Sequence, residues 1–570
     1  MWKLLILPAL AACAAGEICP LGGPVFPAPR RALDTVALNQ TTRNLISSLE
    51  TILRPTNDTE ATAIDATATS FTVQVYSARD SRPLFEYYHT ATSARNNTIG
   101  VNHVDENTVF RIGSCSKLWT VLLLLLETGD ATFNEPVFKY IPELQAAIEK
   151  LKGNDTLVSA IEHVDWEELT VGELASQMAG LERSYGLADR STTPDMMEQL
   201  GFPRLPSSAV PECGIRPTCN REQFFAGPMK RHPVVPTSST PIYSNDAYQL
   251  LGYVIEAQAN QTFKKLVEER LIKRLNLTHS SYNKPADHLG IIPAPGNATD
   301  WDLDMQDFTP TGGLYSSTKD LNTLGRAILN HDLLSPALTR RWLKPAARSA
   351  DNTFSVGHPW EIFTVDDPRT ITLYTKSGDL GGYSTMVGLS PDHDAGFTIL
   401  AAGEGTTQAI WAIGDIIATI GIRGLEAAAK EEAKQRFGGT YMSANSSLEL
   451  TTDDGPGLRI AKWHKEEIDM LKSVATLFGA DPEGDIDIRL YPTGLESPGR
   501  ISFRSILSGP SPTGPANGPL TRVCKAWMLV DGQAYGTVAL DAFVFDVGED
   551  GDAVRVSPRA LRMSLDRDIS

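Results

Sequence analysis

Apolar and polar residues alternate in two short segments near the start of the chain, at 71–76 and 84–88. A period of two is typical of a strand with one buried face, and turn-forming residues separate the two segments. We therefore predict a β-hairpin at this place. Similar patterns predict further strands at 109–112, 370–375, 384–389 and 396–402.

Apolar residues spaced three and four apart predict helices at 38–52, 248–274 and 425–436, and the nine-residue run at 118–126 predicts a buried helix. Strands therefore stand at both ends of this region, with mostly helical sequence between them. This order favours one sheet assembled from both ends of a domain. Residues 186–240 are rich in Pro and Gly, which predicts a long excursion made mainly of loops.

The pattern changes near residue 435. Short alternating stretches, such as 458–461 and 542–545, are separated there by clusters of Gly, Pro and Asp. This composition is typical of a β-rich domain. We expect one domain at 17–435 and a second at 436–570.

The first 16 residues resemble a signal peptide, with Lys3, a short apolar stretch and a small-residue cleavage pattern. The alternative is a buried first helix. Eight Asn-x-Ser/Thr sequons favour a secreted, glycosylated protein. They lie at Asn39, Asn57, Asn96, Asn154, Asn260, Asn276, Asn297 and Asn445.

The 570-residue chain is long enough for two or three domains and carries a formal net charge of −18. An acidic body repels phosphate backbones, so nucleic acid is a poor candidate partner. No apolar run approaches the roughly 18 residues of a membrane span. No Cys and His spacing indicates a metal site, and we expect no cofactor.

Five cysteines remain beyond the leader. Cys213 and Cys219 flank a short loop, which favours a local disulfide bond in an oxidising compartment. Cys19 and Cys524 are candidates for a second bond between the N-terminal and C-terminal regions. Cys115 lies in an apolar segment, where we expect a buried free thiol.

Ser114 and Lys117 stand between the strand predicted at 109–112 and the apolar helix. Residues three apart share a helix face, so these two side chains should meet on its first turn. A serine needs a base within hydrogen-bond reach, and burial would depress the pKa of Lys117 toward that of a usable base. The free N–H of Ser114 at the helix start is a candidate oxyanion donor.

The Ser-x-x-Lys spacing occurs twice more, at 281–284 and 316–319. A solvated helix face is the ordinary explanation of an isolated case. The sequence around 281 predicts a loop, and that around 316 predicts a helix start with Asp320 in its first turn. The order of strand, Gly, Ser and apolar helix distinguishes only Ser114.

Two further motifs complete the candidate site. Tyr243 and Asn245 alternate in an extended segment, so both can face one cleft; a phenol beside an ammonium can be held partly as phenolate and move protons. The ordinary alternative is a packed tyrosine at a helix start.

Lys376, Ser377 and Gly378 end a predicted strand, and the N–H of Asp379 is a candidate second oxyanion donor. The ordinary alternative for Lys376 is an exposed lysine at a sheet edge.

These three motifs, in this order, resemble those of the serine β-lactamase and penicillin-binding-protein superfamily. Tyr-x-Asn is similar to the second motif of class C β-lactamases, D-alanyl-D-alanine carboxypeptidases and related esterases. The segments 110–117, 133–144, 243–256 and 312–321 agree, and the resemblance covers about 35–425. The whole chain is similar to secreted fungal β-lactamase-like proteins.

The resemblance implies an α/β sandwich, with a mostly antiparallel sheet flanked by helices, a helical lobe and a C-terminal β-rich domain. It implies that Ser114 is the acylated nucleophile, Lys117 its base and Tyr243 the proton shuttle. Substrate-binding groups follow at Asn245, Lys376, Ser377, Gly378 and Asp379. The third motif departs from the family in having Ser377 where Thr is usual.

We therefore expect a secreted serine hydrolase that cleaves a small-molecule ester, lactone or amide through an acyl-serine. One alternative uses the same chemistry for acyl transfer, transesterification or transpeptidation in secondary metabolism. A second is a non-catalytic glycosylated binding protein on this scaffold. Segment 186–240 would frame the cleft that binds the substrate. Because it aligns with no part of the family pattern, it does not identify the acyl group of the substrate.

Overall fold

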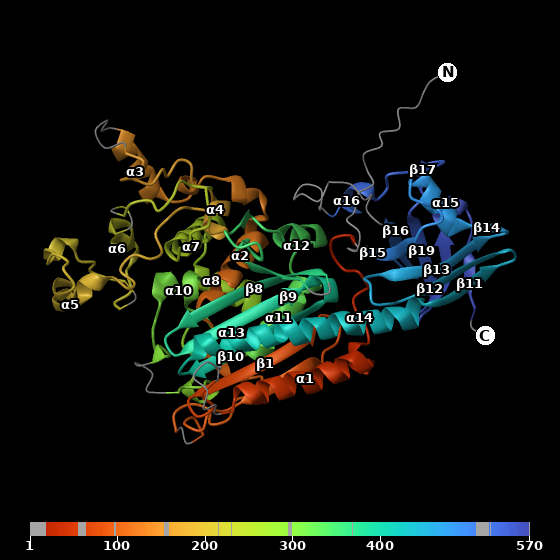
Figure 1. The fold of residues 1–570 in the computed structure, drawn as a ribbon. Helices are drawn as coiled ribbons and strands as arrows, with labels where there is room; N and C mark the ends of the chain where they lie inside the picture. The colour runs from red at the N-terminus through yellow and green to blue at the C-terminus, as the bar shows by residue number, and fades with distance from the viewer. Residues whose placement is uncertain are drawn as a thin grey trace.

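The predicted hairpin forms one edge of a sheet of eight described strands in the computed structural model of the chain (Figure 1). β1 (Thr69–Ser77) pairs antiparallel with β2 (Pro83–His89), which confirms the hairpin. The structure describes residues 19–54, 64–95, 98–152, 159–214, 216–227, 229, 231–293, 299–366, 369–508, 524 and 526–568. The predicted leader lies outside these residues.

Strands from the two ends of the region meet in the middle of this sheet. β1 pairs antiparallel with β10 (Ala395–Gly403), and the sheet order is β2-β1-β10-β9-β8-β7-β6-β5. This order confirms the prediction of a sheet assembled from both ends of a domain. The other strands are β9 (Tyr383–Ser390), β8 (Thr370–Leu380), β7 (Glu361–Asp366), β6 (Phe354–Val356) and β5 (Ala347–Arg348).

Helices cover both faces of the sheet (Figure 1). α1 (Val36–Ile52), α13 (Thr406–Ile416) and α14 (Ile422–Phe437) share one apolar core with β1, β8 and β10. A π-helical turn joins α13 to α14 without a break in the helix. α11 (Thr318–Leu329) packs against β1 and β10 from the other face.

A helical lobe continues the core of the α11 face. α2 (Ser116–Thr128) packs against α7 (Asp246–Ala259), and α4 (Val171–Ala175) lies against α7 as well. The prediction of one helix over 248–274 is wrong, because Asn260 has left-handed backbone (φ 49°) and ends α7. The other described α-helices before the C-terminal region are α3 (Pro142–Lys152), α5 (Pro194–Gln199), α6 (Arg221–Ala226), α8 (Phe263–Leu266), α10 (Thr309–Gly312) and α12 (Pro336–Trp342).

The C-terminal region folds into an antiparallel barrel. Among the described strands, β12 (Ser446–Thr451) pairs with both β11 (Gly439–Ser443) and β13 (Leu458–Lys465), which closes the sheet on itself. Aromatic side chains fill its interior, so it is a packed core. The barrel continues through β15 (Asp487–Ser497), β16 (Arg500–Ser508), β19 (Ala542–Val547), β20 (Ala553–Pro558) and β21 (Leu565–Arg567), with β14 (Ile468–Asp469) beside β13.

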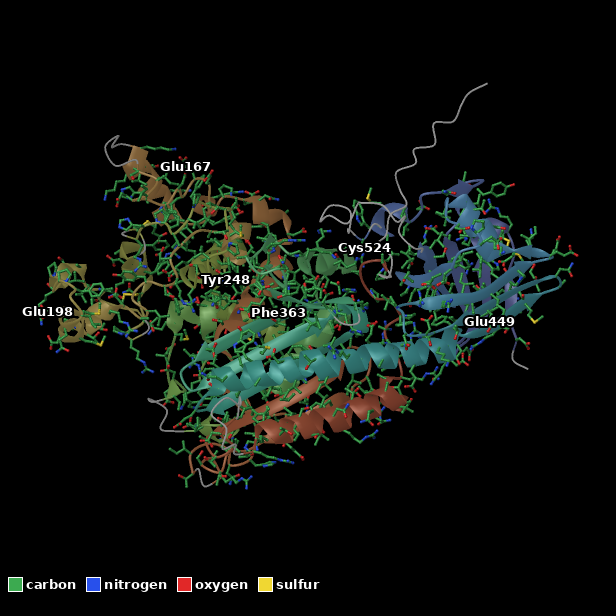
Figure 2. The ribbon with its side chains drawn as sticks, in the orientation of Figure 1. Glu167, Glu198, Tyr248, Phe363, Glu449 and Cys524 are labelled. Atoms are coloured by element: carbon green, nitrogen blue, oxygen red, sulfur yellow. A yellow bond between two sulfur atoms is a disulfide. The ribbon has the colours of Figure 1, made fainter. Side chains whose placement is uncertain are left out.

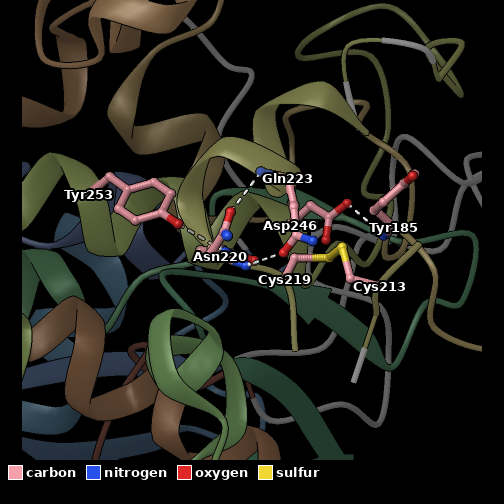
Figure 3. The surroundings of a disulfide bond; sticks show 8 residues. Tyr185, Cys213, Cys219, Asn220, Gln223, Asp246 and Tyr253 are labelled. Atoms are coloured by element: carbon pink, nitrogen blue, oxygen red, sulfur yellow. Dashed lines mark hydrogen bonds between the residues drawn. A yellow bond between two sulfur atoms is a disulfide. The ribbon is translucent and has the colours of Figure 1, made fainter. Parts of the chain in front are cut away.

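Two disulfide bonds join described cysteines. Cys213 and Cys219 are bonded, with their Cα atoms 5.0 Å apart (Figure 3), in the loop-rich excursion that also contains Glu198 (Figure 2). Cys19 and Cys524 are also bonded, and they tie the N-terminal segment to the barrel (Figure 2). Cys115 is a buried free thiol, as predicted, and burial raises its pKa to about 12.

The continuous helix Thr406–Phe437 is long and apolar enough to span a membrane by length and composition. Half of its most apolar window is buried against the sheet and α1, which is typical of a core helix. This is the single helix of that kind among the described residues, so a membrane span is not indicated. Four sequons are exposed, at Asn39, Asn260, Asn276 and Asn445; the other four, at Asn57, Asn96, Asn154 and Asn297, lie outside the described residues.

Candidate active site

The structure brings the first two motifs together. Lys117 Nζ lies 3.1 Å from Ser114 Oγ, within hydrogen-bond distance, and donates to Asn245 Oδ1 at 2.8 Å. A third bond, of 2.7 Å, runs to the carbonyl of Thr311 at the end of α10. Lys117 is fully buried. Three oxygen atoms hold its Nζ in place, and one of them is the Oγ of the candidate nucleophile.

Backbone geometry presents Ser114 at the edge of this cluster. β3 (Val109–Arg111) pairs with β4 (Tyr315–Ser317) and leads into a 3-10 turn, Gly113–Cys115. α2 begins only at Ser116, so Ser114 lies in the 3-10 turn before the helix. The sequence instead predicts that Ser114 lies on the first turn of the helix. Gly113 has φ +48°, a conformation that glycine adopts without strain.

Tyr243 lies among three basic side chains. Its ring centroid is 5.0 Å from Lys117 Nζ, 4.9 Å from the Arg183 guanidinium and 5.5 Å from Lys376 Nζ. Burial raises the pKa of Tyr243, while Lys376 and a hydrogen bond with Ser114 oppose the rise. The expectation of a partial phenolate is wrong, because desolvation outweighs the cations and keeps the phenol protonated.

Lys376 is buried and ion-paired, so the alternative of an exposed edge lysine is wrong. The Lys376 ammonium donates to Glu361 Oε1 and, at 2.7 Å, to the backbone carbonyl oxygen of Ser377. The other carboxylate oxygen of Glu361 accepts from Ser377 N at 2.8 Å. Burial disfavours the charge on Lys376, but Glu361 overcomes that effect and holds the pKa of Lys376 above its ordinary value.

The pKa values of the two lysines are therefore shifted in opposite directions. Burial, followed by repulsion from Lys376, lowers the pKa of Lys117 well below its ordinary value. A neutral amine beside a serine hydroxyl is able to accept its proton. The direction that the sequence predicts for Lys117 is confirmed.

The third motif lies against the turn that carries Ser114. A Cβ added to Gly378 would stand 2.6 Å from Ser114 N, and one added to Gly113 would stand 2.8 Å from Asp379 N. The Asp379 carboxylate accepts from Ser384 Oγ at 2.6 Å and Thr407 Oγ1 at 2.7 Å. The backbone that carries the two candidate oxyanion donors is thus in close contact. The assignment of those donors stays a prediction.

Sequence reasoning missed Glu361 and Arg183. Glu361 is the first residue of β7 and lies opposite Thr375, so only the strand register places it beside Lys376. Arg183 is exposed and follows α4 in a segment without apolar periodicity. A cavity of about 550 Å³ lies elsewhere, lined in part by Phe133, Glu173 and His358, and no residue of the three motifs lines it.

Comparisons with known proteins identify the family. A family model described as beta-lactamase matches residues 62–413, and one described as the C-terminal domain of beta-lactamase-like proteins matches 429–568. A beta-lactamase-like protein of Arthroderma benhamiae is 27% identical over 99% of this chain and 98% of its own. A probable hydrolase of Phoma sp. is 26% identical over 81% of this chain and 75% of its own.

Two solved structures are also similar. A class C beta-lactamase from Rhodobacter sphaeroides has a TM-score of 0.47 and 17% identity, over 67% of this chain and 99% of its own. An octameric penicillin-binding protein homologue from Pyrococcus abyssi has a TM-score of 0.45 and 16% identity, over 93% and 98%. Since the first family model spans more than half of the chain, this protein belongs to the beta-lactamase family of serine hydrolases.

Proposed function

We propose that this chain is a secreted serine hydrolase that cleaves an ester, lactone or amide through an acyl-Ser114 intermediate. The observation that carries the proposal is the 3.1 Å contact between Lys117 Nζ and Ser114 Oγ in a desolvated site. The name of the Phoma relative, a probable hydrolase, supports the same class.

The site residues have consistent roles in this reaction. Neutral Lys117 takes the proton of Ser114 as Oγ bonds to the substrate carbonyl carbon, and the N–H groups of Ser114 and Asp379 hold the oxyanion. Protonated Tyr243 gives its proton to the leaving oxygen or nitrogen, which departs as the acyl-enzyme forms, and recovers a proton from Lys117. Water then attacks the acyl carbon and loses a proton to this pair, and the pair returns a proton to Ser114 Oγ as the acyl C–O bond breaks and the acid leaves.

Secretion is supported by the chemistry of the cysteines. Both disulfide bonds need an oxidising compartment to form and persist. The leader-like first 16 residues and the four exposed sequons support the same compartment. We propose N-glycans at some of the eight sequons.

The test is labelling of the purified chain with a fluorophosphonate, followed by intact mass after incubation with a panel of esters, lactones and β-lactams. We expect one adduct on Ser114 and a transient acyl mass with at least one substrate. Ser114→Ala should abolish both. Ser281→Ala, in the second Ser-x-x-Lys segment, should keep both, because Ser281 Oγ bonds only to the nearby Asn283 carbonyl. Full hydrolysis by Ser114→Ala would refute the proposal.

A further inference from the structure

Gln177 occupies a backbone position that usually takes glycine. α4 ends at Ala175 with Ser176 as its C-cap, and Met178 N donates to the carbonyl of Glu173 at 3.0 Å, which is the bond that closes a Schellman motif. Gln177 is the left-handed residue of this motif, with φ 64°. Gly and Asn adopt this conformation easily, whereas Gln does so with strain, so the side chain is expected to have a compensating role.

The contacts of Gln177 bracket Tyr243. The N–H of Ile242 donates to the Gln177 backbone carbonyl at 2.9 Å, and the N–H of Ser244 donates to Gln177 Oε1 at 2.7 Å. These are the two amides on either side of Tyr243. Gln177 is 7% exposed, so both bonds are shielded from water.

The segment that carries Tyr243 depends on outside contacts for its shape. Residues 241–244 belong to no helix or strand, and α7 begins only at Asp246. The next amide, Asn245 N, donates to the carbonyl of Arg183 at 2.7 Å. The backbone amides at 242, 244 and 245 are thus anchored to the loop after α4. Gln177 accepts the hydrogen bonds of the two amides, at 242 and 244, that flank Tyr243.

We propose that Gln177 is a positioning residue that fixes Tyr243 against Ser114 and Lys117. The inference rests on the proposed function, since it assigns Tyr243 a role in proton transfer. Without the Ser244 bond the phenol loses its fixed place in the site, while the rest of the cleft keeps its shape. Proton transfer is sensitive to such misplacement and substrate binding is less so.

The test compares Gln177→Gly with the wild-type chain on p-nitrophenyl butyrate. Glycine adopts φ 64° freely, so the melting temperature should stay near or above that of the wild type. We expect kcat to fall about 10- to 100-fold with KM little changed, because the loss is one of alignment. Gln177→Glu keeps an acceptor oxygen for Ser244 and should restore more activity than Gln177→Met, which has none.

Gln249→Met is the matched control. Gln249 is a buried glutamine on α7 whose Nε2 donates to Tyr253 Oη at 3.0 Å and not to a residue of the three motifs, so the loss of this amide should leave kcat unchanged. Wild-type kcat in Gln177→Gly would overturn the inference. If the glycine variant does not fold, equal activities of Gln177→Glu and Gln177→Met would overturn it instead.

A wild-type chain that fails to label on Ser114 refutes the proposed function and this inference together. A wild-type chain that labels, with variants whose activity is unaffected, refutes this inference alone.

Discussion

Two lysines lie on the Tyr243 ring with opposite protonation preferences, and one carboxylate accounts for the difference. Glu361 pairs with Lys376 and holds its pKa above the ordinary value, and the charge of Lys376 then helps burial to lower the pKa of Lys117. The sequence could predict the lowered pKa of Lys117 from the apolar run beside it. It could not predict Glu361, because the pairing of β7 with β8 depends on a register that no local pattern specifies.

Glu361→Gln should destabilise the fold and impair the reaction. Removing the carboxylate leaves a buried ammonium without a counter-charge, which costs about 3 kcal/mol in the free energy of unfolding. We expect lower kcat/KM as well, since Ser377 N and Lys376 lose their common partner. Denaturant unfolding and ester hydrolysis measure the two effects. Glu135→Gln removes an exposed partner of Lys139 and should change stability by less than about 1 kcal/mol. Equal losses in both variants would contradict this account of Glu361.

His358 should make stability depend on pH. Burial lowers its pKa to about 4, against about 6.5 in an unfolded chain. The folded state therefore favours neutral His358, and this contribution is complete above pH 6.5 and is lost as the pH falls toward 4. From pH 7 to pH 5 it should cost about 2 kcal/mol.

The measurement is urea unfolding of the wild type and of His358→Phe at both pH values. The phenyl ring can keep the stack on Phe133, whose centroid lies 4.5 Å from the imidazole. The variant should lose about 2 kcal/mol less than the wild type on acidification. An identical pH dependence in the two chains would show that His358 does not titrate in this range.

At the scale of elements, the strands were the most predictable part and the loops the least. Period-two patterns locate β1, β2, β8, β9 and β10, and helical spacing locates α1 and α14. The end of α7 at Asn260 and the turn at 113–115 depend on single left-handed residues, which helical periodicity does not reveal. Candidate residues that lie 129 and 133 positions apart along the chain meet because α2 packs against α7 and β8 passes beside the Gly113 turn.

Gly378→Ala should separate these two elements. The added Cβ would stand 2.3 Å from the carbonyl oxygen of Ile112 and 2.6 Å from Ser114 N, so β8 or the turn must move. We expect a fall of about 100-fold or more in the rate of Ser114 labelling, from misalignment of the nucleophile. Gly382→Ala, in the same hairpin, has its nearest contact at 3.4 Å and should label at nearly the wild-type rate. A wild-type rate in Gly378→Ala would exclude this close contact.

At the scale of the whole molecule, the N-terminal segment binds the barrel to the rest of the chain. Arg30 N and Arg31 N donate to the carboxylate of Glu432 on α14, at 2.9 and 2.8 Å, and Val25 and Phe26 lie in the barrel core. The Cys19–Cys524 bond closes this arrangement across a sequence separation of 505 residues. The sequence offered this pairing as a candidate, but the contacts of 19–31 with the barrel could not be predicted because the segment has no regular pattern.

Replacing Cys19 and Cys524 by alanine together should lower thermal stability while leaving Ser114 reactive. A native disulfide bond contributes about 2–4 kcal/mol, and this one lies in the barrel region. Differential scanning calorimetry and fluorophosphonate labelling measure the two quantities. Loss of labelling at a temperature where the variant remains folded would show that the bond also shapes the active site.

α14 contributes to two cores at once. Ile422, Leu425 and Ala428 pack with the large sheet, whereas Ala429, Ala433 and Phe437 pack inside the barrel. The boundary we propose near 435 falls within this helix, so a chain shortened there would lose Phe437, whose ring contacts Phe503 and Phe545. We therefore expect that neither domain can be exchanged with that of a relative without changes to α14. In such a chimaera, the whole of α14 should come from the protein that supplies the barrel. The residues of its first turns must then be made complementary to the sheet of the other protein.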